Sequence, residues 1–142
     1  MSAVKDHMDT TPLPKQRPVI YIAGPYTNPD PVLNTHRIVQ FANRLMDLQV
    51  CYPVVPHTTL LWHAICPRPV EDWYELDIAV MLRTQGVIRF PGASSGADAE
   101  IETAIEHGLP VFEIPKHYAA YAFPPVEKLK QWIRDEVPQP VA

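Results

Sequence analysis

The chain has 142 residues, of which 46% are hydrophobic and 20% charged, and its formal net charge is -4. These values describe a single globular domain, and the acidic balance argues against a nucleic-acid polymer as partner. No apolar run reaches the roughly 18 residues of a membrane span, and the N-terminus lacks the apolar core of a signal peptide, so we expect a cytoplasmic protein with no membrane partner. Cys51 and Cys66 have no metal-type spacing, and neither do the histidines, so we predict two reduced thiols, no metal and no cofactor.

The N-terminal half of the chain predicts a tail followed by a strand, a helix and a second strand. Residues 1–17 are polar and carry prolines, which is typical of a flexible tail. Residues 19–23 form a continuous β-prone run that suits a strand covered on both faces. Apolar residues then recur at helical spacing from Ile38 to Leu45, and residues 50–55 predict a strand whose proline suggests an edge position.

The C-terminal half continues the alternation of helices and strands. Its predicted elements are a short helix at 57–65, a longer helix from residue 70, a strand at 86–90, a helix at 97–107, a strand at 109–114 and a helix at 126–136. Residues 138–142 are a C-terminal tail, which leaves residues 18–137 as one domain. Strands that alternate with helices predict an α/β fold with four to five mostly parallel strands. Such sheets bind ligands at the carboxyl ends of their strands, so we expect the site in the loops at 23–28, 55–58 and 91–96.

The most informative segment is Phe-Pro-Gly-Ala-Ser-Ser-Gly-Ala-Asp-Ala-Glu at residues 90–100. A strand ends there at a Pro-Gly break, and a helix begins that carries Glu100. Helix N-termini attract anions and keep carboxylates ionised, and an ionised carboxylate in a pocket can attack a sugar carbon. We therefore predict Glu100 as a nucleophile, and we predict Ser94, Ser95 and Gly96 as part of the substrate site.

A purely structural interpretation of the same segment is also open. Glu100 would then only favour the helix dipole, and Ser95 would form a simple capping box with Asp98. The segment follows a strand at the end of the sheet where ligands bind, and this position favours a functional role.

Asp77 is the second candidate acid. It lies four residues after Trp73 and three before Val80, which places a carboxylate on a largely apolar helix stripe. Burial without a partner raises the pKa of such a group and suits it to act as a general acid. The alternative is a carboxylate that pairs with a Lys or Arg, or one that lies at the solvent edge.

Five further residues are candidates for substrate contacts. Gly24 permits close approach of a ligand to the backbone. Tyr26 is either a hydrogen-bonding partner of a sugar or a catalytic carboxylate, or a packing residue. His57 is either a contact to a base or phosphate, or a structural hydrogen-bonding residue. Trp62 and Trp73 are able to stack on a nucleobase, and core packing is the alternative for at least one of them.

Four motifs follow one another along the chain, each after the element expected for it. They lie at residues 21–26 (Tyr-Ile-Ala-Gly-Pro-Tyr), 53–57 (Pro-Val-Val-Pro-His), 73–77 (Trp-Tyr-Glu-Leu-Asp) and 94–100 (Ser-Ser-Gly-Ala-Asp-Ala-Glu), and Ala104, Gly108, Pro110 and Val111 come after them. Their order resembles that of the nucleoside 2-deoxyribosyltransferase-like superfamily, over residues 18–114. The resemblance is strongest to small bacterial and phage members, and the chain is also similar to the 2'-deoxynucleoside 5'-phosphate N-hydrolases.

The resemblance implies a flavodoxin- or Rossmann-like fold of three α/β/α layers and a catalytic glutamate. Glu100 would attack C1' of a 2-deoxyribosyl group, release the base and form a covalent glycosyl ester, which water would hydrolyse or a second base would accept. Asp77 would protonate or hydrogen-bond the leaving base, following the logic of retaining glycoside cleavage. Tyr26 would orient the glutamate, and Gly24 would make room for the substrate.

Ser94 bears on the choice of substrate within this resemblance. Transferases that act on free nucleosides tend to carry Asp at this place, whereas the nucleotide hydrolases carry Ser, whose neutral hydroxyl tolerates a 5'-phosphate. The resemblance therefore favours hydrolysis of a 2'-deoxynucleoside 5'-monophosphate, with deoxyribosyl transfer as the alternative. The first loop, Gly-Pro-Tyr-Thr, lacks the serine and arginine that hold phosphate in those hydrolases. Arg37, Arg89 or the backbone N–H groups at 94–97 would have to substitute.

The resemblance also implies self-association. Members of the superfamily complete their sites with residues of a neighbouring subunit, so we expect a homodimer or a larger homo-oligomer.

Two rival functions remain beside this hypothesis. Residues 91–100 are loosely similar to the Pro-Gly-Gly-x-Gly-Thr-x-x-Glu loop of the phosphoribohydrolases related to cytokinin activation, which also cleave N-glycosidic bonds. A non-catalytic nucleotide-binding or sensor module on the same fold is the other possibility. The joint presence of Asp77 and Glu100 argues against that module, because binding alone needs no paired carboxylates.

Overall fold

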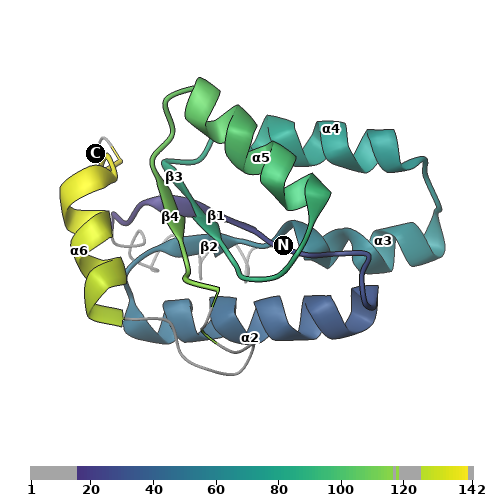
Figure 1. Cartoon of the computed structure of the whole chain (residues 1–142), viewed down its shortest axis with the longest axis horizontal. Helices are drawn as coiled ribbons and strands as arrows, with labels where there is room; N and C mark the ends of the chain where they lie inside the picture. The colour runs from purple at the N-terminus through teal and green to yellow at the C-terminus, as the bar shows by residue number, and fades with distance from the viewer. Residues whose placement is uncertain (1–15, 117, 119–125, 141–142) are drawn as a thin grey trace, which may run out of the picture.

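The computed structural model describes residues 16–116, 118 and 126–140, and Figure 1 shows how its elements are arranged. Residues 1–15 of the predicted N-terminal tail and residues 141–142 of the C-terminal tail lie outside this described part. Its strands are β1 (Val19–Ala23), β2 (Tyr52–Val54), β3 (Gly86–Arg89) and β4 (Val111–Glu113). Its helices are α2 (Pro31–Leu48), the 3₁₀ helix η1 (Pro56–Thr59), α3 (Leu60–Ile65), α4 (Val70–Met81), α5 (Ser95–Glu106) and α6 (Val126–Glu136).

Every strand and helix expected from the sequence is present, and the differences lie at the ends of the elements. The strands expected at 50–55 and 109–114 are three residues long each, as β2 and β4. Both lie at the edges of the sheet. Pro53 is tolerated in β2 because an edge strand has a neighbour on one side only, as the proline had suggested. The helix expected at 57–65 is divided into η1 and α3.

The four strands form one parallel sheet with the order β2-β1-β3-β4. β1 lies in its interior, with Tyr21 opposite Val54 of β2 on one side and Val87 of β3 on the other. The chain leaves β1 toward β2 and leaves β3 toward β4, so the two connections diverge at the carboxyl ends of β1 and β3. This arrangement confirms the predicted α/β fold, and it creates the switch point at which open α/β sheets bind ligands.

Helices cover both faces of the sheet and make three layers (Figure 1). On one face, Ile20 and Ile22 of β1 pack in a core with α2 and α6. On the other face, Tyr21 and Ala23 pack in a second core with α4 and α5. Successive side chains of a strand point to opposite faces, so burial on both sides explains why β1 is a continuous apolar run.

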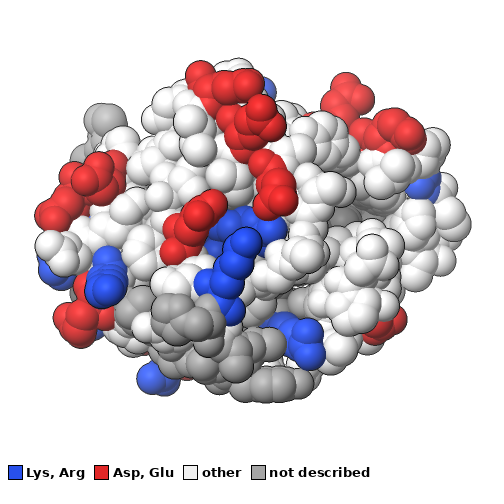
Figure 2. Space-filling model, in the orientation of Figure 1, with Lys and Arg blue, Asp and Glu red and all other residues white. Residues whose placement is uncertain are grey.

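An acidic surface covers helix α5. Asp98, Glu102 and Glu106 are exposed at intervals of four residues along this helix. Figure 2 shows acidic side chains gathered over it. A surface of this kind repels phosphate-rich polymers.

The described part of the chain also bears on the membrane and thiol predictions. No helix in it combines the length and the apolar character that crossing a membrane requires. Cys51 lies directly before β2 and is buried, and Cys66 caps the C-terminal end of α3 and is exposed. Both are free thiols, as predicted.

Candidate active site

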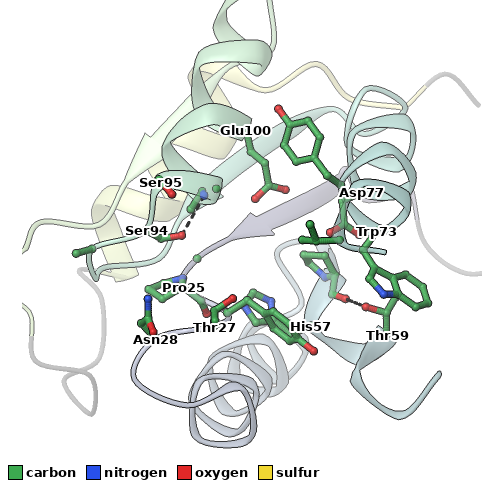
Figure 3. A pocket seen from close by; sticks show the side chains of 18 residues that line it. Pro25, Thr27, Asn28, His57, Thr59, Trp73, Asp77, Ser94, Ser95 and Glu100 are labelled. Atoms are coloured by element: carbon green, nitrogen blue, oxygen red, sulfur yellow. Dashed lines mark hydrogen bonds between the residues drawn. The ribbon is translucent and has the colours of Figure 1, made fainter. Parts of the chain in front are cut away.

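A cavity of about 410 Å³ lies at the carboxyl ends of β1 and β3. Its walls come from the β1–α2 loop, η1, α4 and the loop that leads into α5, as Figure 3 shows. It is lined by Gly24, Tyr26, His57, Trp73, Asp77, Ser94, Ser95, Gly96 and Glu100, all of which are predicted site residues. Trp62, the other candidate for stacking on a nucleobase, does not line it. The structure therefore brings together residues that are up to 76 positions apart, while their chemical roles stay predictions.

Glu100 reaches the cavity from the second turn of α5. The N-cap of this helix is Ser94, whose Oγ accepts a hydrogen bond from the N–H of Ala97 at 3.1 Å. The capping box expected from Ser95 and Asp98 is therefore wrong, because Asp98 instead pairs with Arg89 at 3.0 Å. The helix starts one residue earlier than that box requires. Glu100 lies on its inward side and is 8% exposed.

Tyr21 of β1 is the direct partner of Glu100. Its hydroxyl donates a hydrogen bond to Oε2 of Glu100, although the two residues lie 79 positions apart. Burial, with the charge of Glu100 second, raises the pKa of Tyr21 far above its ordinary value, so the hydroxyl keeps its proton and remains a donor. Tyr21 was not predicted as a site residue, because it lies inside an apolar strand. The signal was a single hydroxyl in the run Val-Ile-Tyr-Ile-Ala.

Tyr26 does not take the place expected for it beside the glutamate. Its ring stands edge-on to the ring of His57, with the centroids 5.6 Å apart. Burial, followed by the charge of Asp77, raises the pKa of Tyr26. Tyr26 therefore lines the cavity beside His57, and the hydrogen bond predicted from it to Glu100 is made by Tyr21 instead.

Asp77 enters the cavity from α4, on the side away from α5 (Figure 3). No ion pair between described residues involves it, so the alternative of a carboxylate paired with Lys or Arg does not apply there. Trp73 lies one turn earlier on the same face of α4 and lines the cavity beside it.

Burial raises the pKa of both acids to about 7, from ordinary values of 4.5 for Glu100 and 3.8 for Asp77. For Glu100, the hydrogen bond from Tyr21 and the charge of Arg89 oppose the effect of burial, while the charge of Asp77 adds to it. The expectation that the helix N-terminus keeps Glu100 ionised is therefore wrong, because the influence of a helix end fades within the first turn. Near pH 7 the two carboxyl groups together hold about one proton.

His57 fastens the loop that follows β1. Its Nε2 lies 2.7 Å from the carbonyl oxygen of Pro25, to which it donates, and the side chain is 3% exposed. Burial lowers the pKa of His57, against the opposing effect of the Pro25 and Gly24 carbonyl groups. The ring is thus neutral near pH 7 and adds no positive charge to the cavity.

The two glycines of the site, Gly24 and Gly96, differ in the space around them. A Cβ at Gly24 would lie 2.6 Å from Cδ1 of Ile38 and 3.1 Å from Cβ of Phe90, so close packing against the core favours glycine there, and the room for a ligand expected from it stays a prediction. A Cβ at Gly96 would meet nothing closer than 3.9 Å. Gly96 therefore leaves open space at the start of α5, next to the exposed Ser95.

The two arginines suggested for phosphate binding have different positions. Arg89 is buried, and its guanidinium donates to the carbonyl oxygens of Phe90 at 2.5 Å and Gly92 at 2.9 Å. It thereby holds the strand–loop–helix junction together and does not line the cavity. Arg37 lines a neighbouring hollow of about 320 Å³, which shares the Pro25 and Asn28 wall with the cavity.

Among the described residues, no group of three or more His, Cys, Asp or Glu side chains is arranged to hold a metal ion. Comparison with known proteins finds no family model that matches the chain, and no match among curated proteins. The geometry of the cavity is therefore the basis of the functional argument.

Proposed function

We propose that this protein cleaves the N-glycosidic bond of a 2'-deoxynucleoside or its 5'-monophosphate through a glutamate nucleophile and releases the free base. We propose with it that the chain is a member of the nucleoside 2-deoxyribosyltransferase-like superfamily. The observation that carries the proposal is a pair of carboxyl groups, the buried Glu100 and the half-buried Asp77, which come from two helices into one cavity and whose pKa values are both raised to about 7. Retaining glycoside cleavage requires such a pair, with one ionised member and one neutral member.

The surroundings of the two acids support a division of roles. The Tyr21 hydroxyl and the Arg89 charge favour the ionised form of Glu100, whereas burial alone governs Asp77. The proposal assigns the carboxylate to Glu100, whose negative charge has a hydroxyl donor and a nearby cation to stabilise it, and the proton to Asp77. Because Tyr21 binds Oε2 of Glu100, the other oxygen, Oε1, is left for attack.

The proposed reaction has two steps. Oε1 of Glu100 attacks C1' while the C1'–N bond breaks. The electron pair of the C1'–N bond goes to the base nitrogen, which takes the proton of Asp77. A glycosyl ester of Glu100 and a free base result. Water, deprotonated by the Asp77 carboxylate, then attacks C1' and returns Glu100 to its starting state. A second base in the place of water would give deoxyribosyl transfer instead.

The size and lining of the cavity are compatible with a nucleoside. Its volume of about 410 Å³ lies within the range of small-molecule sites. Trp73 and Tyr74, on the same helix as Asp77, and Tyr26, beside His57, supply aromatic surface to the cavity, which suits a nucleobase. Ser94 Oγ accepts from Ala97 and still has its own proton to donate to a sugar or phosphate oxygen.

The charges of the cavity support the uncharged deoxynucleoside over its 5'-monophosphate. Two acids line it, His57 is neutral, and no Lys or Arg among the described residues lines it. These charges oppose the preference for the 5'-monophosphate that Ser94 implies through the resemblance. Binding of the monophosphate would have to draw on Arg37 in the adjoining hollow. Arg37→Gln should then lower kcat/KM for the monophosphate and leave the value for the nucleoside unchanged.

The test is release of free base from a panel of 2'-deoxynucleosides and their 5'-monophosphates, followed by chromatography. Glu100→Gln and Asp77→Asn should abolish release, and the exposed acids Glu102→Gln and Glu75→Gln, on the same two helices, serve as matched controls. Rapid quenching and mass spectrometry should find the deoxyribosyl adduct on the peptide that contains Glu100. Full turnover by Glu100→Gln would rule the mechanism out. Adding a second base separates transfer from hydrolysis, and tight binding of nucleosides without any release would indicate the binding module.

A further inference from the structure

A side-chain cluster outside the cavity holds Trp73, one of the cavity walls. The Nε1–H of Trp73 on α4 donates a hydrogen bond to Nδ1 of His63 on α3, at 2.8 Å. The rings of His63 and Trp62 stand nearly perpendicular to the indole of Trp73, at angles of 77° and 82° and centroid distances of 5.7 and 5.0 Å. Neither His63 nor Trp62 lines the cavity, so both act on it only through Trp73. Figure 3 shows the Trp73 side chain at the edge of the site, near Asp77.

The same ring nitrogen of His63 accepts a second donor. The backbone N–H of Arg68 lies 3.2 Å from Nδ1. A ring nitrogen that accepts N–H groups carries no proton of its own, so the proton of the neutral ring is on Nε2. The side chain of Arg68 in turn binds the carboxylate of Asp72, with Nη2 and Oδ2 2.8 Å apart. One acceptor atom therefore joins α3, the α3–α4 connection and the first turn of α4.

The hydrogen bond from Trp73 to His63 affects the surroundings of Asp77, because Trp73 and Asp77 are one turn apart on the same face of α4. A base that stacks on the indole would lie beside the carboxyl group that protonates it. We propose that His63 is a positioning residue, whose Nδ1 fixes the indole of Trp73 as the wall against which the leaving base stacks. The inference rests on the proposed function and extends it to a residue outside the cavity.

Two substitutions of His63 separate the acceptor from the bulk of the ring. His63→Asn keeps an acceptor oxygen near the position of Nδ1, whereas His63→Leu keeps apolar bulk without an acceptor. The first readout is the indole N–H signal of Trp73 in a ¹H–¹⁵N spectrum, assigned with Trp73→Phe. His63→Leu should move this signal and speed its exchange with water, and His63→Asn should leave both close to wild type. An unchanged signal in His63→Leu would overturn the proposal.

The second readout is kinetic. His63→Leu should lower kcat/KM for the deoxynucleoside about fivefold, the size expected from one lost hydrogen bond, and His63→Asn should stay within about twofold of wild type. A displaced indole signal in His63→Leu with kcat/KM unchanged would overturn the proposal. If His63→Leu does not fold, His63→Gln makes the same test. Its longer side chain carries the amide past the position of Nδ1, so it too lacks an acceptor at that position.

Failure of the proposed function would be recognised separately. If the wild-type protein releases no base from any deoxynucleoside, the proposed reaction is wrong, and the positioning role is judged by binding alone. Adenine or cytosine should then shift the Trp73 indole signal in wild type and in His63→Asn, at about fivefold lower concentration than in His63→Leu. The absence of any shift in wild type with either base would overturn the positioning role as well.

Discussion

Replacing Glu100 by Gln should stabilise the protein, and the gain should depend on pH. Burial raises the pKa of Glu100 from 4.5 to about 7 in the folded protein. Between these values the unfolded chain gives up the proton while the folded protein keeps it, so unfolding becomes more favourable as the pH rises. At about 1.36 kcal/mol per pKa unit, the penalty is about 3 kcal/mol above pH 7 and nearly absent below pH 4.5. Gln has the same shape, still accepts a hydrogen bond from Tyr21 and never ionises, so the penalty disappears.

Urea denaturation of wild type and Glu100→Gln at pH 5 and pH 8 measures this effect. The advantage of the variant in free energy of unfolding should be about 2–3 kcal/mol larger at pH 8 than at pH 5. Glu102→Gln is the control, because it removes an exposed acid from the same helix. An advantage of Glu100→Gln that is equal at both pH values would refute burial as the source of the raised pKa.

Three further substitutions test other parts of the site. Tyr21→Phe removes the hydroxyl that favours ionised Glu100. The acidic limb of the pH–rate profile should therefore move to higher pH, and kcat/KM near pH 6 should fall about tenfold. An acidic limb at the same pH as in wild type would contradict this role. Gly96→Ala has room for its methyl group, so thermal denaturation should show a gain of about 0.5–1 kcal/mol in the free energy of unfolding, while KM should rise. An unchanged KM in the stabilised variant would exclude Gly96 from the substrate site. Gly92→Ala should lose about 1–3 kcal/mol of stability, because its φ is +128° and the new Cβ would lie 2.6 Å from Cγ of Pro25, and a melting temperature equal to that of wild type would argue against this strain.

The elements of the fold were predictable because their signals are local. The apolar run of β1 and the helical spacing of α2 are properties of a few neighbouring residues. The Pro-Gly break at residues 91–92 likewise marks the end of a strand wherever it occurs. The ends of β2 and β4 were predicted too far out, because the length of an edge strand depends on how far its single neighbour extends beside it.

The sequence predicted which loops and acids form the candidate site, but not the contacts between their side chains. Loops that follow parallel strands meet at one end of the sheet, so Gly24, His57 and Ser94 could be expected together. Tyr21 could not, because its hydroxyl finds Glu100 only when β1 lies under α5. The partner of Tyr26 and the carbonyl groups that Arg89 binds were not predictable for the same reason, since the direction of each side chain depends on the elements packed against it.

The sequence by itself thus determined the alternation of strands and helices, the end of the sheet that carries the site and the two acids that enter it. The spacing of hydrophobic residues and the residue types at turns act over a few neighbouring residues, so they can be read from a single sequence. Only the tertiary structure decided which hydroxyl binds Glu100, which carbonyl groups Arg89 binds and how strongly both acids hold their protons. These properties depend on water removed and partners supplied by segments far away in the chain, and no local pattern contains that information.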